Sequence, residues 1–196
     1  MESMRNIGLF LIGLLLILIL MASATFTVDQ REYALVKRLG EVISVKQQAG
    51  LYFKMPFVDS VTYFDNRILT LSWEEPDRFI TSEKKNVLVD SFVKWRIIDP
   101  KKYYVSVRGD EAQAERRLSQ MVNDGLRAEF GKRTIHDVVS GERSQIMEIL
   151  RQRADRESRQ IGIQVLDVRL KRVDLPENVS NSVYDRMEAE RKSVAN

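Results

Sequence analysis

The spacing of apolar and polar residues changes several times along the chain. An uninterrupted apolar run from Ile7 to Phe26 comes first, and no charged residue lies between Arg5 and Asp29. Segments with apolar residues at every second position follow, and segments with apolar residues at every third or fourth position come after them. These patterns predict one apolar helix, then a set of strands, then helices.

The first apolar run is long enough to cross a lipid bilayer. As a helix, its 20 residues would span about 30 Å, the thickness of the hydrocarbon layer. We therefore expect residues 1–28 to form a transmembrane anchor. A cleaved signal peptide is the alternative, because Ala22-Ser23-Ala24 matches the small-residue pattern of a cleavage site. Residues expected in the anchor include Ile7, Leu14, Leu20 and Phe26.

Alternating apolar and polar residues predict a sheet after the anchor. Tyr33–Arg38 and Glu41–Lys46 flank Leu39-Gly40 and indicate a hairpin. The clearest strand is Asn86–Ile98, with valines, Trp95 and an isoleucine on one face and charged residues on the other. A sheet with one polar face is expected to be mostly antiparallel. Further strands are expected at Val61–Phe64, Ile68–Trp73 and Ile163–Val173.

The segment Gly50–Val58 is the most apolar stretch outside the anchor, and two interpretations of it remain open. It could be a core strand or a loop that Pro56 restricts to a sheet edge or a bend. Alternatively, its aromatic residues could lie at the membrane surface with a lysine extending beside them. The residues in question are Tyr52, Phe53, Lys54 and Phe57.

Helical spacing predicts three helices in the second half. The first begins at Asp110, where Gln113 completes a capping pattern, and ends near Gly131. The second covers Glu142–Gln160. The last follows Pro176 and has a narrow apolar seam typical of a coiled coil, which suits contact with a neighbouring subunit. The seam consists of Val179, Val183, Met187 and Val194.

The order of these segments predicts an α+β fold between two helices of different character. We expect the anchor at residues 1–28, a membrane-proximal, strand-rich part at 29–78, and a mixed part at 79–175. The start of an assembly helix is expected at 176–196. That helix is still amphipathic and uncapped at the last residue, so either the chain is a fragment that lacks the rest of a coiled coil or it assembles differently.

Composition predicts no catalytic, cofactor or metal site. The net charge of +3 comes from 31 basic and 28 acidic residues without a concentrated basic patch, which argues against nucleic acid as a partner. The chain has no cysteine and a single histidine, His136, too few for a usual zinc site or a Cys-His pair. Ser82 and Ser91 begin S-x-x-K matches, which we interpret as chance.

Several long segments in consistent order resemble the SPFH family, also called band 7, which includes prohibitins and stomatins. The resemblance implies an α+β domain with a mostly antiparallel sheet, followed by a long helix that packs against neighbouring subunits. It also favours the membrane-proximal interpretation of Tyr52–Phe57. The segments that carry it are Gly50–Val58, Asp65–Arg67, Asp77–Ile97, Ile161–Glu177 and Tyr184–Arg191.

The bacterial branch of the family supplies the expected function. The resemblance implies a non-enzymatic, single-pass protein of the bacterial inner membrane, with its SPFH domain in the periplasm. It would form a hetero-oligomer with an HflK-like paralogue and regulate an FtsH-type AAA protease, without cofactor or small-molecule substrate. Two alternatives stay open: a stomatin-like scaffold of lipid microdomains with no protease partner, and a membrane-bound serine hydrolase that uses Ser82 or Ser91.

Overall fold

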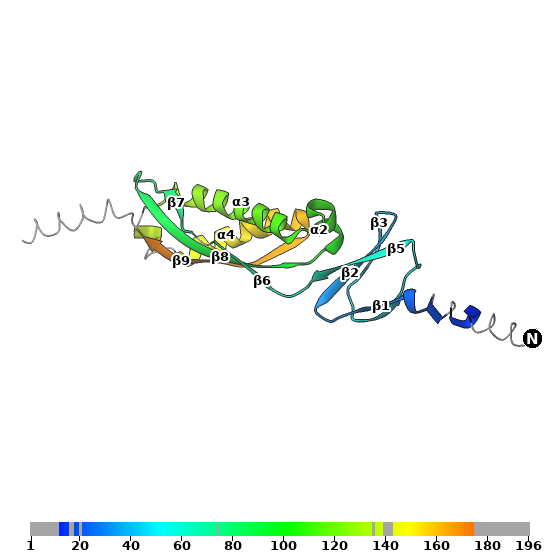
Figure 1. Ribbon diagram of the computed structural model, residues 1–196. Coiled ribbons are helices and arrows are strands. Elements are labelled where there is room, and N and C mark those ends of the chain that lie inside the picture. The colour runs from blue at the N-terminus through cyan, green and yellow to red at the C-terminus, as the bar shows by residue number, and fades with distance from the viewer. Residues whose placement is uncertain are drawn as a thin grey trace, which may run out of the picture. The chain divides into compact units, whose positions relative to one another are not determined.

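The computed structural model describes residues 12–15, 18–19, 21–73, 75–134, 136–138 and 143–174. The chain divides into two compact units, and each is described by itself (Figure 1). The first unit is Met1–Arg67 with Ile97–Gly109, and the second is Ile68–Arg96 with Asp110–Asn196.

The first unit contains two antiparallel sheets and one helix. Strands β1 and β4 form the smaller sheet, and the larger sheet has the order β3-β2-β5. Ala34 and Leu35 are fully buried because β2 is the central strand of the larger sheet. The antiparallel pairing expected from the sequence is therefore confirmed here. The elements are β1 (Thr25–Val28), β2 (Glu32–Arg38), β3 (Glu41–Lys46), β4 (Gly50–Phe53), β5 (Asp59–Asp65) and α2 (Pro100–Val107).

The hairpin expected around Leu39-Gly40 is confirmed, with a turn of two residues between β2 and β3. Both turn residues have positive φ, 48° at Leu39 and 93° at Gly40, as in the tight turns that suit the twist of a hairpin. Glycine adopts this conformation freely, whereas a residue with a Cβ loses roughly 1–2 kcal/mol. Leu39 is also 92% exposed, so contacts within the chain offset little of that cost.

The apolar N-terminal run does not stay helical to residue 28. Helical residues end at Ser23, and β1 begins at Thr25. Phe26 is buried in β1, where its ring stacks on that of Tyr52 at a centroid distance of 5.8 Å. The prediction that Phe26 belongs to the anchor helix is thus wrong. In a continuous apolar run, the spacing of apolar residues does not show where a helix ends and a strand begins.

Of the other residues expected in the anchor, Leu14 lies in a helical segment and is exposed. Ile7 and Leu20 lie outside the described residues. Among the residues that are described, no helix combines the length and the apolar character needed to cross a bilayer.

Helix α2 follows the long strand of the second unit, and the sequence patterns did not predict it. Asp99 caps it by accepting a hydrogen bond from the backbone N–H of Lys102 at 3.0 Å, and Pro100 occupies its first turn. The buried ring of Tyr103 meets Phe64 of β5 edge to face at 5.4 Å. Gly109 follows the helix with φ +78°, next to the Phe64 ring.

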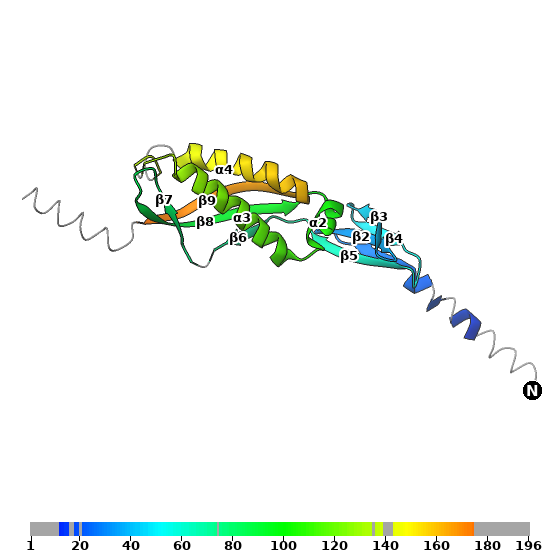
Figure 2. The same ribbon diagram turned by 90° about the horizontal axis from the view of Figure 1, so that it is seen from above.

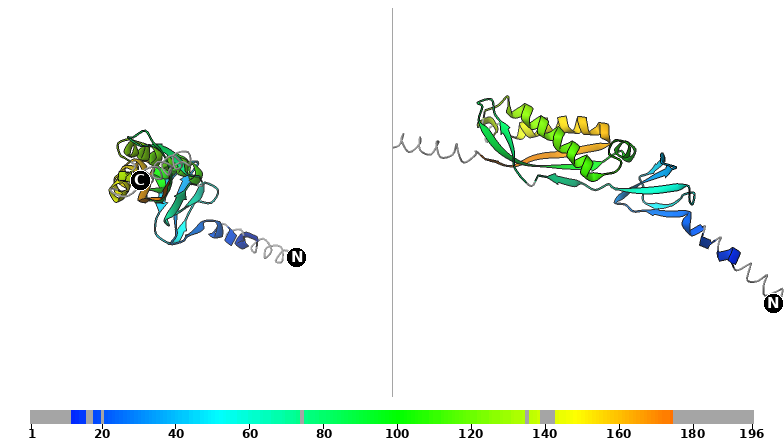
Figure 3. Two further views of the ribbon diagram at one scale, coloured as in Figure 1. Left: turned by 90° about the vertical axis from the view of Figure 1, so that its left-hand side faces the viewer. Right: turned by 45° about the horizontal axis from the view of Figure 1, so that its top comes forward.

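The second unit is a sheet covered on one face by two helices (Figures 2 and 3). Strands β6 and β7 pair antiparallel with successive parts of β8, and β9 also pairs with β8. Burial alternates along β8 as the sequence predicted, with Val87 and Trp95 fully buried and Lys94 exposed. The elements are β6 (Leu69–Ser72), β7 (Asp77–Ile80), β8 (Asn86–Ile97), α3 (Glu111–Phe130), α4 (Arg143–Ser158), the 3₁₀ turn η2 (Arg159–Ile161) and β9 (Ile163–Asp174).

Helices α3 and α4 confirm the two helices expected from periodicity. Asp110 caps α3 by accepting from the backbone N–H of Gln113 at 3.3 Å. The two helices approach closely at Gly125, where a Cβ would lie 3.0 Å from Leu150 Cδ2 of α4. The small residue therefore permits this packing.

Strand β9 is buried in two phases. Ile163 and Val165 are buried in its first half, and Val168 and Leu170 in its second half. The sequence predicted a single alternation that places Leu166, Val168 and Leu170 on the same face. The structure confirms this for Val168 and Leu170. It does not for Leu166, which lies before the change of buried face and is only half-buried. Side chains of α4 and its C-terminus bond to the backbone of β9: Asp155 to Val165 N–H, Ser158 to Ile163 C=O and Arg143 to Leu170 C=O.

The boundary between units also differs from the expectation. The sequence suggested a division between residues 78 and 79, but the structure divides the chain after Arg67 and returns Ile97–Gly109 to the first unit. The reason is strand pairing, since β6 and β7 both pair with β8. Pairing between distant segments leaves no mark in local periodicity.

Candidate functional site: an apolar end of the first unit

Five apolar residues of β4 and the loop that follows it are exposed at one end of the first unit. Their exposure runs from 38% at Val58 to 94% at Phe57. Contiguous exposed apolar side chains usually mark a contact with another molecule or a membrane. We call this surface the apolar end, and it consists of Leu51, Phe53, Met55, Phe57 and Val58.

The apolar end lies directly beside the end of the N-terminal helical residues. Thr25, which starts β1, pairs with Phe53 in the strand register. One residue further on, the Lys54 N–H donates to the Ala24 carbonyl at 2.7 Å. The described helical residues carry further exposed apolar side chains, at Ile12, Leu14, Leu15, Leu18, Ile19 and Met21. Backbone bonds thus connect two exposed apolar segments that are about 30 residues apart in sequence.

Asp59, at the start of β5, holds the loop of the apolar end in place. Its carboxylate accepts from Arg38 Nε at 2.8 Å, from Arg38 Nη2 at 3.1 Å and from the Met55 N–H at 2.9 Å. The Asp59 N–H in turn donates to the Met55 carbonyl at 3.0 Å. The hydrogen bonds from Arg38 and then from Met55 lower the pKa of Asp59 below its ordinary value.

Phe57 is held in a conformation that aromatic residues rarely adopt. Its φ is +66°, in the left-handed region, which costs a residue with a Cβ roughly 1–2 kcal/mol. Its side chain is 94% exposed and so recovers almost nothing by packing within the chain. Moving a phenylalanine of this exposure into an apolar medium would contribute about 1.5–3 kcal/mol, enough to offset the backbone cost.

The structure separates the four residues that the sequence grouped as membrane-proximal. Phe53 and Phe57 are exposed and Lys54 is half-buried. Tyr52 points the other way, packs against the core of the unit, and donates from its hydroxyl to the Gln48 carbonyl at 2.9 Å. The core interpretation therefore fits Tyr52, and the exposed interpretation fits Phe53 and Phe57.

Sequence reasoning missed the exposure of Leu51 and Met55 and the role of the Arg38–Asp59 pair. Alternation along Leu51–Phe53 was the available signal for Leu51, because it places Leu51 and Phe53 on the face opposite Tyr52. No signal pairs Arg38 with Asp59 in sequence, since their contact depends on the register of β2 with β5.

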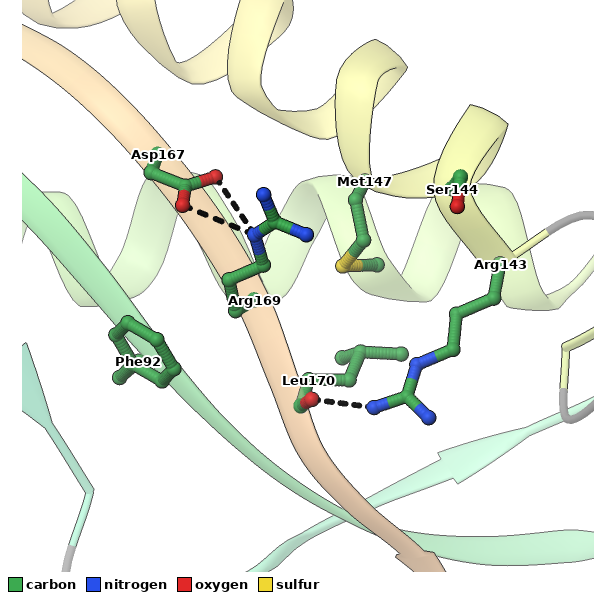
Figure 4. A pocket seen from close by; sticks show the side chains of 7 residues that line it. All are labelled: Phe92, Arg143, Ser144, Met147, Asp167, Arg169 and Leu170. Carbon is green, nitrogen blue, oxygen red and sulfur yellow. Dashed lines mark hydrogen bonds and ion pairs between the residues drawn. The ribbon is translucent and has the colours of Figure 1, made fainter.

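The second unit has a pocket of about 410 Å³ along β9 (Figure 4). Its arginines are already engaged: Arg169 donates to the Asp167 carboxylate at 2.9 Å, and Arg143 donates to the Leu170 carbonyl at 2.5 Å. Ser144 supplies the only hydroxyl of the lining, and the lining contains no histidine or lysine to serve as its base. The residues that line the pocket are Phe92, Arg143, Ser144, Met147, Asp167, Arg169 and Leu170.

The serines of the hydrolase alternative do not form a catalytic arrangement. Ser91 is buried on the core face of β8, whereas Lys94 is exposed on the opposite face. Ser82 is exposed in a turn, where Lys85 pairs with Glu83 at 3.3 Å. Across the described part of the chain, no three histidine or acidic side chains are grouped so as to hold a metal ion.

The residues of the predicted assembly seam, Val179, Val183, Met187 and Val194, lie outside the described residues.

Comparison with known proteins places the chain in a family. The family described as "SPFH domain / Band 7 family" matches residues 26–196. Protein HflC of Haemophilus influenzae is 48% identical over 155 residues, covering 77% of this chain and 52% of that protein. Protein HflC of Vibrio parahaemolyticus is 36% identical and covers 93% and 67%.

A further relative has a name that states a role. Modulator of FtsH protease HflC, of Escherichia coli K12, is 31% identical over 228 residues, covering 93% of this chain and 68% of that protein. The chain spans about half to two thirds of the length of these curated relatives. These matches and the antiparallel α+β architecture agree, and the chain belongs to the SPFH domain/Band 7 family.

Proposed function

We propose that this chain is an HflC-like scaffold subunit that is anchored in the bacterial inner membrane and modulates an FtsH-type AAA protease. The similarity to HflC relatives, one of them named as a modulator of FtsH protease, carries the protease part of the proposal. The subunit co-assembles with an HflK-like paralogue and acts through its surfaces, without a catalytic step of its own. Its SPFH domain lies on the periplasmic side.

The apolar end supports a position of the first unit against the bilayer. Its exposed residues continue from the exposed apolar helical residues that precede β1, through the Lys54–Ala24 backbone bond. Phe53 and Phe57 would enter the boundary between headgroups and acyl chains, and Lys54 would extend its ammonium toward the headgroups. The described helical residues, 12–15, 18–19 and 21–23, would then be the membrane-side continuation of this surface.

Extraction in a mild detergent followed by affinity capture tests the protease part. The full chain is expressed in a bacterium that makes the partners. We expect it to capture both an HflK-like protein and an FtsH-type protease. Mass spectrometry of the intact assembly identifies the captured subunits. Recovery of the paralogue without the protease would favour a stomatin-like lipid scaffold instead. Recovery of this chain alone would contradict the proposal.

The predicted seam provides a second test. Replacing Val183 and Met187 by glutamate is expected to abolish co-purification of the HflK-like partner, because buried carboxylates destabilise a helix–helix seam. Lys192→Glu is the matched control, since it adds negative charge at a residue that helical spacing places on the face opposite the seam. Unchanged assembly of the double variant would refute the seam.

A further inference from the structure

The turn between β2 and β3 carries a further exposed apolar residue, which is not part of the apolar end as defined above. Leu39 is 92% exposed at that turn. Its neighbour Arg38 pairs with Asp59 in the register of β2 with β5 and binds the Asp59 carboxylate. Since Asp59 also closes the loop that carries Met55 and Phe57, the turn and the loop lie at the same end of the three-stranded sheet (Figure 1).

The opposite end of this sheet has a different character. There the β1–β2 turn and the end of β5 bring together charged residues, which line a pocket of about 430 Å³. Strands β2 and β5 separate the two ends by seven residues each, or about 20 Å. One end therefore carries exposed apolar side chains next to the Arg38–Asp59 pair and Glu41, whereas the residues that line the pocket at the other end are all charged. The charged residues are Asp29, Arg31, Glu32, Asp65 and Arg67.

We propose that Leu39 enters the same bilayer surface as Phe57, so that the first unit rests on the membrane through two loops as well as through its N-terminal helix. The inference depends on the proposed membrane position of the apolar end. Two observations favour lipid as the occupant: the continuity of the surface with the apolar helical residues, and the position of Lys54 between the exposed Phe53 and Met55.

Both tips have left-handed backbones, with φ 48° at Leu39 and 66° at Phe57, and neither side chain packs within the unit. The hairpin turn accounts for the backbone of Leu39, and a medium that accepts apolar side chains accounts for the exposure of both tips. Three contacts also do what a helix alone cannot, since they fix the rotation of the unit about the helix axis. The charged end is then held away from the lipid.

The cysteine-free sequence makes the test direct. Single variants Leu39→Cys, Phe57→Cys and Gln30→Cys of the full chain are labelled with an environment-sensitive fluorophore. They are reconstituted in phosphatidylethanolamine–phosphatidylglycerol vesicles with or without lipids that carry a quencher. Gln30 is the matched control, because it is exposed in the turn at the charged end of the same sheet. Thermal unfolding of each labelled variant checks that it folds as the parent does.

Labels at positions 39 and 57 are expected to be quenched about two-fold or more, and the label at position 30 is expected to be unaffected. Quenching at 57 without quenching at 39 would overturn this inference and leave the proposed membrane position intact. Absence of quenching at both would overturn both proposals. Equal quenching at all three positions would contradict contact through two loops.

Discussion

At the scale of single residues, the positions with positive φ separate structural from functional constraints. Gly109 has φ +78°, and a Cβ there would lie 2.6 Å from Phe64 Cε1, so its glycine is required by packing. Gly40 has φ +93°, and a Cβ added there would meet nothing within 4 Å, so only its backbone conformation matters. The hairpin turn accounts for the similar backbone of Leu39, whereas Phe57 lies in no hairpin turn, and neither side chain packs inside the fold.

This contrast predicts the effects of two alanine substitutions. Gly109→Ala is expected to lower the free energy of unfolding by about 2–3 kcal/mol, because it adds a clash with Phe64 to the cost of the left-handed backbone. Gly40→Ala is expected to cost only about 1 kcal/mol. Urea unfolding of the detergent-solubilised chain measures both. Equal losses would show that Phe64 moves aside without cost.

The Arg38–Asp59 pair predicts a dependence of stability on pH. The pKa of Asp59 is lowered in the folded chain, so its contribution is fully present above the unfolded value of about 3.9 and is lost as pH falls through the lower folded value. Asp59→Asn is therefore expected to lower the urea midpoint at pH 7, and the difference from wild type should shrink as pH falls from about 4 toward 2.

The matched control for Asp59→Asn is Glu41→Gln, which changes an exposed carboxyl at the same end of the sheet. This control should leave the pH profile close to that of wild type. A constant difference between Asp59→Asn and wild type across the acidic range would show that the carboxylate charge is not what stabilises the loop.

At the scale of elements, local periodicity predicted the long, regular segments and several of the short strands, such as β6, but missed other short elements. Strand β8 and helices α3 and α4 were predictable because each has many residues with one consistent period. Strand β1 was missed because it continues the N-terminal apolar run. Helix α2 has only eight residues, and β7 only four. The buried face of β9 changes along the strand, and residues of α4 bond to its backbone on both sides of this change, which no local pattern records.

The contact between α3 and α4 predicts an element-scale effect. Gly125→Leu would drive a side chain into Leu150 Cδ2, which already lies 3.0 Å from the position of a Cβ. We expect a loss of about 1–3 kcal/mol in the free energy of unfolding, as for other overpacked sites. Ala112→Leu is the control, because Ala112 is exposed on α3. Similar stability of the two variants would show that the helices separate at little cost.

At the scale of the whole molecule, we propose that this family member acts through its position at the membrane and its contacts with partner proteins. The sequence alone located the apolar segment at residues 50–58, because its composition is unusual for a domain surface. Alternation places Tyr52 and Phe53 on opposite faces of β4, but it could not show which of them faces the core, or that Arg38 and Leu39 join the same end. Those facts come from strand register, which couples residues about 20 positions apart.

The central claim is that the N-terminal apolar run remains attached and holds the domain at the membrane. The most direct measurement is the intact mass of the protein recovered from bacterial membranes after an alkaline carbonate wash, compared with that of the wash supernatant. We predict a chain in the membrane pellet that retains the residues before Thr25. A polypeptide that begins at Thr25 and is released into the supernatant would contradict this claim.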